Sequence, residues 1–247
     1  MEIKILKNPE ELGKQAAALT AKILNQAIAR KGKARLLLST GASQFDTLNA
    51  LVKEDIDWSK VEMFHLDEYV NLPEEHPASF RKYLKERFTK LVDVKKAYFV
   101  NGEGDIGKNI KDLTEEIRKE PVDIGLVGIG ENAHIAFNDP PADFDTKEAY
   151  IVVALDKKCK EQQVREGWFP DVDSVPGQAI SMTVYQMMQC KIIISCVPHK
   201  VKAHAIKQTL ESTLTNQIPA TMLKEHGNWR LFLDTASASL LGDRTDV

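Results

Sequence analysis

The chain has 247 residues, enough to bury a full hydrophobic core, and its 33 basic and 36 acidic side chains give a formal net charge of −3. Charges of both signs are spread along the chain without long blocks of one sign. We therefore expect neither a nucleic-acid surface nor a polybasic membrane face.

Cysteine usage and the apolar segments indicate the compartment. The three cysteines, Cys159, Cys190 and Cys196, have no CxxC spacing and no His-rich segment nearby, which indicates neither a disulfide framework nor a zinc site. The first residues, MEIKILKNPEEL, lack the apolar core of a signal peptide, and no later segment approaches the length needed to span a bilayer. We expect a cytoplasmic protein that could form a homo-oligomer.

Strand and helix patterns alternate along the chain. In chain order they predict a strand at 2–6, a helix at 8–30, a strand at 34–38, a helix after Ser43, a strand at 61–66, a helix at 79–91, a strand at 97–100, a helix at 106–118 and a strand that opens 122–140. Further on they predict a strand at 149–155, a helix at 157–165, a strand at 179–183, a short helix, a strand at 191–197, a helix after Lys200, a short helix from Ile218 and a strand at 229–233. We expect one domain over 1–247, with a lid-like segment at about 157–176.

This alternation is typical of an α/β fold in which a mostly parallel sheet carries helices on both faces, a Rossmann-like three-layer arrangement. Ligands bind such sheets outside the carboxyl ends of the strands. Four expected strands end in polar residues, and parallel strands place those ends at one edge. We expect these groups to lie together: Thr40 to Ser43, Asp67-Glu68, Asn132 to Asp139, and His199-Lys200.

The segment 122–140, VDIGLVGIGENAHIAFNDP, is the most informative in the chain. A short apolar run breaks at two glycines, and Asn132, His134 and Asp139 follow among small and apolar neighbours. The ordinary pKa of histidine lies nearest neutrality, and a carboxylate five residues on could orient the ring or stabilise its charge. A lone histidine in a turn is more often structural, so the interpretation depends on the other strand ends.

The segment from Ser39 to Ser43 is small and hydroxyl-rich, and it lies at the expected start of a helix. Free backbone N–H groups at such a position favour an anion such as phosphate. The segment has neither a Walker lysine-serine pair nor GxGxxG spacing, so an ordinary strand-to-helix turn fits about equally well. Lys200, at another strand end, could supply a countercharge, although a lone lysine there is usually only solvated.

Asp67 directly follows the expected strand at 61–66, whose other residues look buried. Its carboxylate should lie partly desolvated at the floor of the crevice, where its pKa is raised and it can act as a base. The alternative is a cap of a helix or turn, a role that Asp often fills. The neighbouring Glu68 is expected to point elsewhere, and we assign it no chemistry.

Together and in this order, these segments resemble the glucosamine-6-phosphate deaminase/isomerase family, which shares its fold with the 6-phosphogluconolactonases. The matching segments are STGAS at 39–43, FHLDEY at 64–69, EHPASF at 75–80 and GIGENAHIAFNDP at 128–140. The likeness runs from about Leu36 to Asp234. The lactonases typically have DGHTASLFP in place of NAHIAFNDP, and an arginine where this chain has Tyr69.

The resemblance implies isomerisation of an amino-sugar 6-phosphate coupled to loss of ammonia, without a metal or organic cofactor. It implies that His134 assists opening of the pyranose ring, that Asp67 moves a proton from C2 to C1, and that Asp139 holds His134 in the useful tautomer. It also implies a set of phosphate-binding residues, namely the backbone of Thr40, Gly41, Ala42 and Ser43 with Lys200 and Arg165 as countercharges.

The chain departs from the family pattern near His134 and in the lid-like segment. Asn132 and Ala133 stand where members often have Asp and Gly, and Asp139 stands where they have Glu. Asn132 cannot share a charge with His134, so the histidine would depend more on Asp139, which is one methylene shorter. The segment 157–176 only loosely resembles the family's segment, which ends in an arginine and two aromatic residues.

The sequence therefore predicts an enzyme that converts glucosamine 6-phosphate to fructose 6-phosphate and ammonia. Galactosamine 6-phosphate is an alternative substrate, because the lid-like segment diverges. A 6-phosphogluconolactonase is a second alternative, and it would need no base at Asp67. A sugar-phosphate sensor without turnover is a third, suggested by Asn132 and Asp139, but the chain has no attached DNA-binding module.

Overall fold

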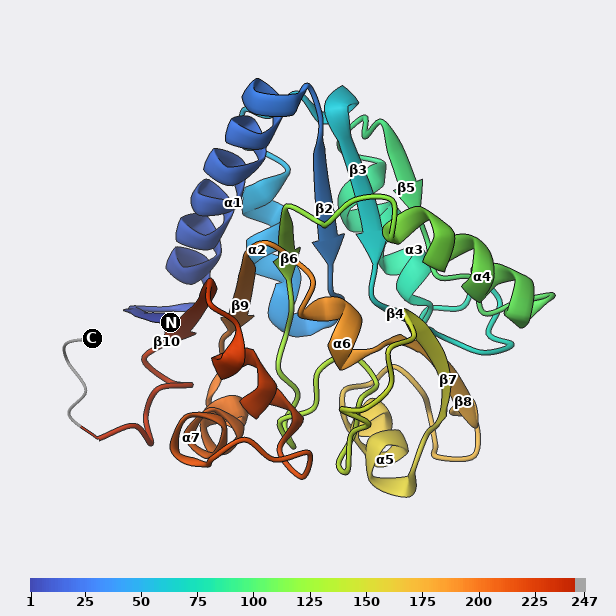
Figure 1. Cartoon of the computed structure of the whole chain (residues 1–247). Coiled ribbons are helices and arrows are strands. Elements are labelled where there is room, and N and C mark those ends of the chain that lie inside the picture. The colour runs from blue at the N-terminus through green and yellow to red at the C-terminus, as the bar shows by residue number, and fades with distance from the viewer. Residues whose placement is uncertain (243–247) are drawn as a thin grey trace.

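Seven parallel strands form the main sheet of the protein (Figure 1). The structure, a computed structural model, describes residues 1–242 apart from the side chain of Lys158. The strand order is β1-β10-β9-β6-β2-β3-β5, and all neighbours run parallel. The strands are β1 Glu2–Leu6, β2 Ala34–Leu38, β3 Val61–His65, β5 Lys96–Tyr98, β6 Ile124–Leu126, β9 Ile193–Val197 and β10 Trp229–Asp234.

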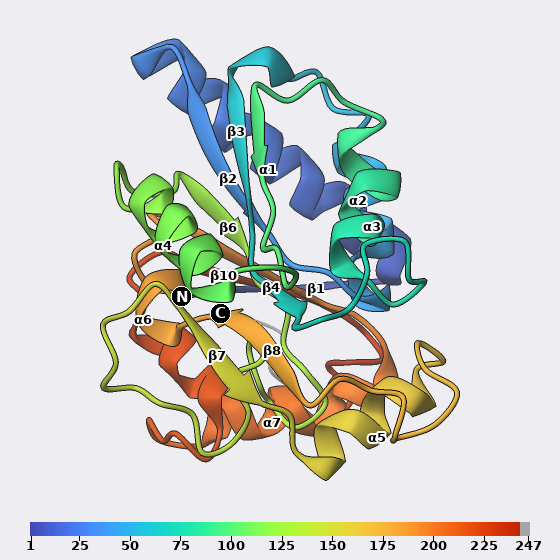
Figure 2. The ribbon, with the colours of Figure 1, turned by 90° about the vertical axis from the view of Figure 1, so that its right-hand side faces the viewer.

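Helices cover both faces of this sheet (Figure 2). One face carries α1 (Pro9–Lys31), α2 (Phe45–Leu51) and α3 (Phe80–Leu84), and the other carries α4 (Ile106–Ile117), α6 (Val184–Met187) and α7 (Ala203–Glu211). Each face buries its own hydrophobic core, because the strands of a parallel sheet are apolar on both sides. The predicted three-layer α/β fold with a mostly parallel sheet is confirmed.

Local residues set the bounds of α1, the first helix. The side chain of Asn8 accepts a hydrogen bond from the backbone N–H of Glu11 at 2.9 Å, and Pro9 occupies the first helical position. Gly32 ends the helix with a φ of 75°, a left-handed conformation that glycine adopts without a steric penalty. These capping residues explain why the start and end of this helix are readable from the sequence.

A second, three-stranded antiparallel sheet lies beyond the carboxyl ends of the main sheet (Figure 1). Its order is β4-β8-β7, where β4 is Asp67–Tyr69, β8 is Gln178–Met182 and β7 is Tyr150–Ala154. Strands near 149–155 and 179–183 are predicted and present, but the strand–helix alternation does not reveal that they form a separate sheet. Asp67 also opens a strand of its own, one residue after β3 ends. The helix α5 (Lys157–Arg165) connects β7 to β8.

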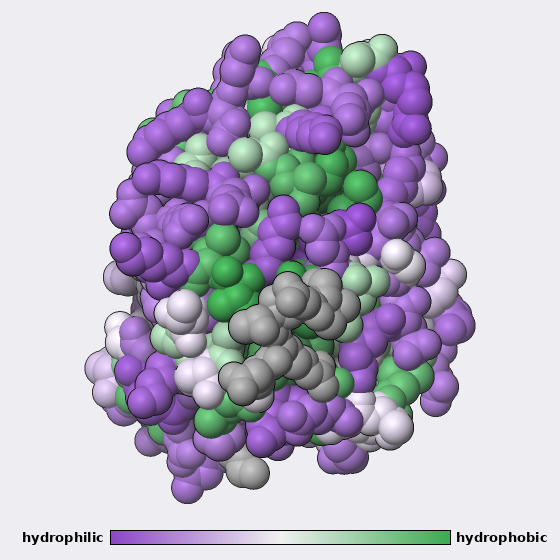
Figure 3. Space-filling model, turned by 90° about the vertical axis from the view of Figure 1, so that its left-hand side faces the viewer, coloured by the Kyte–Doolittle hydropathy of each residue, from purple (hydrophilic) through white to green (hydrophobic). Residues whose placement is uncertain are grey.

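The surface drawn in Figure 3 is mostly hydrophilic, with apolar areas between the polar side chains. Within residues 1–242, no helix is both long and apolar enough to cross a membrane. The same residues hold no group of three or more His, Cys, Asp or Glu side chains placed to bind a metal. The three cysteines are buried, free thiols.

Candidate active site

One cavity lies where the central strands of the main sheet end. Strands β9, β6, β2 and β3 are neighbours, and the chain order reverses between β2 and β6, the position where open parallel sheets bind ligands. The cavity has a volume of about 250 Å³. Its lining comes from the loops after these strands, from the segment of α5 and from α3, and it includes Ser39 to Ser43, Asp67, Phe80, Gly128 to Glu131, His134, Gln162, Gln163, Glu166, Trp168, His199, Val201 and Lys202.

The predicted site residues fall into three groups in the structure. Those that line the cavity are Thr40, Gly41, Ala42, Ser43, Asp67 and His134. Asn132 and Asp139 contact His134 from outside the lining. Lys200 and Arg165 are not among the lining residues, although each neighbours one of them.

The loop from Ser39 to Ser43 is held rigidly at the end of β2. Gly41 has a φ of 104°, which side chains with a Cβ rarely adopt, and Tyr83 donates its hydroxyl to the Gly41 carbonyl at 2.9 Å. Gln44 donates from Nε2 to the carbonyl of Cys196 at 3.1 Å and so ties the loop to β9. The Oγ of Ser39 is buried and has no hydrogen-bond partner within residues 1–242.

The lysine that faces the cavity is Lys202, not the predicted Lys200. Both lie in the 3₁₀ turn Lys200–Lys202, whose three residues per turn make side chains two positions apart point in different directions. Lys202 is only 9% exposed and lines the cavity, whereas Lys200 is exposed. Burial lowers the pKa of Lys202, and the charges of Glu166 and Glu131 oppose this shift. Lys202 is therefore the better candidate for a phosphate countercharge.

Arg165 forms an ion pair instead of facing the cavity. Its guanidinium lies 2.9 Å from the carboxylate of Glu131, and its side chain is 60% exposed. The pair connects α5 to the loop after β6, because Glu131 belongs to that loop. Exposed ion pairs of this kind contribute little to stability, about 0–1 kcal/mol.

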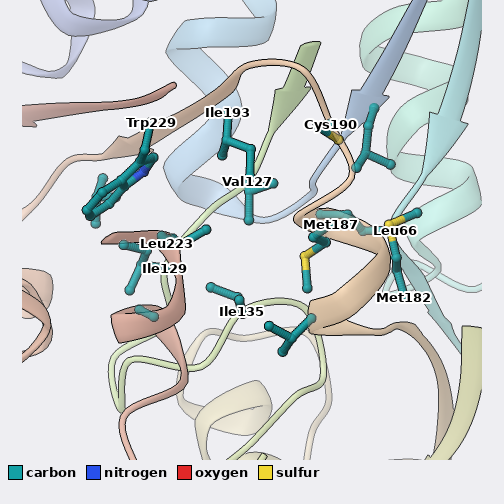
Figure 4. Close-up of a cluster of buried hydrophobic side chains, with 14 of the residues drawn as sticks. Leu66, Val127, Ile129, Ile135, Met182, Met187, Cys190, Ile193, Leu223 and Trp229 are labelled. Atoms are coloured by element: carbon teal, nitrogen blue, oxygen red, sulfur yellow. The ribbon is translucent and has the colours of Figure 1, made fainter. Parts of the chain in front are cut away.

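The loop after β6 is anchored in the hydrophobic core. Figure 4 shows Ile129 and Ile135 among the buried side chains of the core that also contains Val127 and Leu223. Asn138 donates from Nδ2 to the carbonyls of Ile135 and Met182, both at 2.8 Å. These contacts hold the loop between β6 and β8 and fix the position of the residues between the two isoleucines.

Two alanines of this loop adopt left-handed backbone conformations, with φ of 63° at Ala133 and 50° at Ala136. Such conformations cost about 1–2 kcal/mol for a residue with a Cβ. The carbonyl of Ala133 accepts a hydrogen bond from the N–H of Ala220 at 2.9 Å, which helps to hold this geometry. Glycine would adopt the conformation of Ala133 without this cost, because it has no Cβ.

Gly130 leaves room for the imidazole of His134. A Cβ at position 130 would lie 2.2–2.5 Å from three atoms of the His134 ring, a distance that no real contact permits. The ring therefore packs directly against the backbone of Gly130. The N–H of Gly130 also donates to the carbonyl of His134 at 2.9 Å.

Replacing Gly130 by Ala is therefore expected to displace His134 and to lower kcat by about a hundredfold, since a displacement near 1 Å of a catalytic group has that effect. The measurement is steady-state turnover, with Gly107→Ala as the control because a Cβ there meets only an ordinary contact. A Gly130→Ala protein with the parent kcat would show that the position of this ring does not matter.

Asn132 and Asp139 orient His134 together. Nδ1 of His134 lies 2.6 Å from Oδ1 of Asn132 and 3.3 Å from Oδ1 of Asp139. The amide of Asn132 donates to Asp139 at 3.0 Å and its oxygen accepts from the N–H of His134 at 3.1 Å, so its orientation is fixed. Nδ1 must then carry the hydrogen, which leaves Nε2 for a ligand.

Asp139 contacts His134 although its side chain is one methylene shorter than that of the glutamate expected at this position. Burial acts to raise the pKa of Asp139, but hydrogen bonds from His134 and Asn132 and the charge of His134 outweigh it and lower that pKa. Asn132 makes the nearer contact with the His134 ring through its Oδ1, and its Nδ2 donates a hydrogen bond to the carboxylate of Asp139. An asparagine at position 132 thus supports the histidine without carrying a charge.

Asp67 lies at the floor of the cavity and is 6% exposed. Burial, and then the charge of Glu68, raise the pKa of Asp67 to about 8. A carboxylate with a pKa near the working pH is suited to both accept and return a proton. The expected desolvated carboxylate is present at this position.

The lid-like segment packs firmly over the second sheet. The hydroxyl of Tyr69 donates to Oε1 of Gln163 at 2.7 Å, and both side chains are buried. Gln162 and the indole N–H of Trp168 donate to the carboxylate of Glu166, at 2.7 and 3.2 Å. A third hydrophobic cluster lies beneath α5, formed by Tyr69, Leu72, Ala78, Phe137, Leu155, Cys159, Phe169, Val175 and Ala179.

Known sequences are similar to this chain over nearly its whole length. The model of the glucosamine-6-phosphate isomerases/6-phosphogluconolactonase family matches residues 7–231. The chain belongs to this family. A glucosamine-6-phosphate deaminase of Lactobacillus delbrueckii subsp. bulgaricus is 34% identical over 242 residues, which cover 98% of this chain and all of the relative. The family that the sequence motifs predict is therefore confirmed.

Solved structures of the family have the same fold. One is a monomeric glucosamine-6-phosphate deaminase with a TM-score of 0.89 and 29% identity, covering 97% of this chain and 100% of that chain. Another is a 6-phosphogluconolactonase from Shewanella baltica with a TM-score of 0.77 and 19% identity, covering 95% of this chain and 97% of that chain. At 19% identity the lactonase shares the fold, while the deaminases are nearer in both sequence and structure.

Proposed function

We propose that this protein converts glucosamine 6-phosphate and water to fructose 6-phosphate and ammonia in the cytoplasm. The full-length relatives named for this activity support the proposal. The observation that carries it is the buried Asp67, which shares one cavity with His134 and with the loop from Ser39 to Ser43. This combination provides a base, a proton shuttle and a phosphate site within reach of one sugar.

The first step is opening of the pyranose ring at His134. Because Nδ1 is engaged by Asn132 and Asp139, Nε2 accepts the proton of the C1 hydroxyl and delivers it to the ring oxygen. Asp139 stabilises the imidazolium that forms between the two transfers. The product of this step is the open-chain aldehyde.

Asp67 carries the isomerisation. Its ionised carboxylate takes the proton from C2 while a proton of the substrate's own ammonium group passes to the carbonyl oxygen, which gives an enolamine. Asp67 then returns the proton to C1 and leaves an iminium at C2. Water adds to this carbon and ammonia departs, so the atoms balance without a redox partner. The substrate's own carbonyl accepts the electrons, and the reaction needs no metal or organic cofactor.

The phosphate is held at the other end of the cavity. Backbone N–H groups of Thr40 to Ser43 donate to its oxygens, and Lys202 supplies the countercharge. A buried lysine strengthens such a contact, because the surroundings screen the charges less than water does. Arg165 takes no direct part, since it is paired with Glu131.

A lactonase reaction fits this cavity less well. Hydrolysis of a lactone needs no carboxylate base at C2, so it gives no role to the buried carboxylate of Asp67 at the cavity floor. Galactosamine 6-phosphate differs from glucosamine 6-phosphate only at C4 and would follow the same mechanism. A sensor without turnover would not need Nε2 of His134 to be free.

The test is release of ammonia and fructose 6-phosphate by the purified protein. We expect turnover of glucosamine 6-phosphate, with galactosamine 6-phosphate and 6-phosphogluconolactone measured in parallel under the same conditions. Faster turnover of galactosamine 6-phosphate would reassign the substrate but keep the mechanism. Hydrolysis of the lactone with no ammonia release from either amino sugar would refute the proposed reaction.

A further inference from the structure

Glu68 is a buried carboxylate directly beside the proposed base. Asp67 and Glu68 are consecutive residues of β4, and side chains alternate between the two sides of a strand. Asp67 therefore faces the cavity, while Glu68 lies on the opposite side against the start of α3. Glu68 is fully buried, with an exposed fraction of 0%. A buried carboxylate without a role is costly, so its contacts need an explanation.

Five donors surround the carboxylate of Glu68. Oε2 accepts from Oγ of Ser79 at 2.8 Å, from the N–H of Arg81 at 2.9 Å and from Nε of Arg81 at 3.2 Å. Oε1 accepts from the N–H of Tyr69 at 3.0 Å and from the N–H of Phe80 at 3.2 Å. These hydrogen bonds join β4 to the first turn of α3.

The guanidinium that pairs with Glu68 is shared with a second carboxylate. Besides Glu68, Arg81 donates to Oε2 of Glu103 at 2.8 Å, to Oδ1 of Asn101 at 2.7 Å and to the carbonyl of Leu72 at 2.8 Å. One cation thus faces two anions. The negative charge of Glu68 is therefore only partly compensated, and it acts on its neighbours.

We infer that Glu68 is a positioning residue for Asp67, because its hydrogen bonds lock β4 to α3 and keep a negative charge directly behind the base. The same bonds fix Phe80, which lines the cavity with Asp67. The inference rests on the proposed function, in which Asp67 moves the C2 proton. A base with a like charge behind it binds a proton more tightly, and this favours its removal of the proton from C2.

The other groups around Asp67 do not supply that charge. Ser181 of β8 is the residue opposite Asp67 and is uncharged. Glu131 and Glu166 line the cavity near Lys202. Among the described residues, other titratable groups near Asp67 or in the cavity lining include Tyr69 on β4, Tyr150 on β7, Cys159 on α5, His134, His199 and Lys202. Burial raises the pKa of the first three and keeps them neutral.

The experiment titrates Asp67 without substrate, by carbon-13 NMR of labelled aspartate carboxyls, with Asp67→Asn used to assign the signal. In Glu68→Gln, the midpoint of the Asp67 titration is expected to fall by about one pH unit, because a like charge has been removed. The control is Ser79→Ala, which removes a hydrogen bond to the same oxygen of Glu68 but no charge, and in which the midpoint should stay in place.

A second variant keeps the test independent of the folding of Glu68→Gln. Glu103 is 43% exposed, so Glu103→Gln should fold, and it frees Arg81 to neutralise Glu68 more fully. The midpoint of Asp67 is then expected to fall by a few tenths of a unit. An unmoved or higher midpoint in Glu68→Gln or Glu103→Gln, or an equal fall in Ser79→Ala, would overturn the inference.

The titration separates the two proposals. If the midpoint moves as expected and the acidic limb of kcat/KM moves with it, both the positioning role and the base role of Asp67 are supported. If the midpoint moves but the parent protein turns over no amino-sugar phosphate, Glu68 still sets the charge state of Asp67, and the proposed function fails alone.

Discussion

Replacing Asp67 by Asn is expected to lower kcat for ammonia release by about a thousandfold, the usual contribution of a positioned base. Asn has nearly the same shape, so the KM for glucosamine 6-phosphate should change little. The loss should therefore fall on kcat alone, because the missing proton acceptor affects only the transition state. The measurement is a pair of saturation curves for the parent and the variant at one pH.

The pH profile of the parent protein provides the control for this result. Burial and the charge of Glu68 raise the pKa of Asp67 to about 8, and only the ionised carboxylate can act as the base. Activity should therefore rise with pH about tenfold per unit below pH 8 and level off above it. A profile that is flat between pH 5 and 8 would contradict the assignment of Asp67, as would an Asp67→Asn protein with parent kcat.

Replacing Lys202 by Ala is expected to raise the KM for the sugar phosphate by about tenfold to a hundredfold, the range for loss of one hydrogen bond to a charged group. The kcat should change less, because the phosphate is remote from the reacting carbons. Lys202 faces the cavity and is nearly buried.

Lys200→Ala is the matched control. It also removes one lysine charge, but from an exposed residue that lies two positions before Lys202. It should leave the KM unchanged. A larger rise of KM in Lys200→Ala than in Lys202→Ala would contradict the structure and restore the residue that the sequence alone favours. The KM values of the two variants should also be compared at several salt concentrations, because salt screens an exposed charge more than a buried one.

The main sheet was predictable because strand and helix patterns alternate with clear capping residues, as at Asn8 and Gly32. The gathering of strand ends in one cavity was predictable for the same reason, because parallel strands share an edge. The separate antiparallel sheet was not predictable. Its strand β4 has only three residues and follows β3 after a single residue, so the sequence pattern shows one continuous strand.

A pattern in the sequence could have distinguished Lys202 from Lys200 as the lysine that faces the cavity. Lys202, Ile206 and Thr209 recur at helical spacing on the buried side of α7, and Lys200 does not fit that series. The role of Asn132 as the nearest partner of His134 required the loop geometry, since spacing alone favours Asp139. Apart from the N–H of Tyr69, the donors to Glu68 lie 11 to 13 residues further along the chain, and nothing in the local pattern indicates them.

The most direct test of the central claim follows the C2 hydrogen of glucosamine 6-phosphate during turnover in deuterium oxide. If Asp67 moves this proton, part of the fructose 6-phosphate formed by the parent protein should carry deuterium at C1 when examined by proton NMR. Asp67→Asn should form labelled product about a thousandfold more slowly, in line with its lower kcat. Labelled fructose 6-phosphate formed by Asp67→Asn at the parent rate would contradict the account and place the base elsewhere in the cavity.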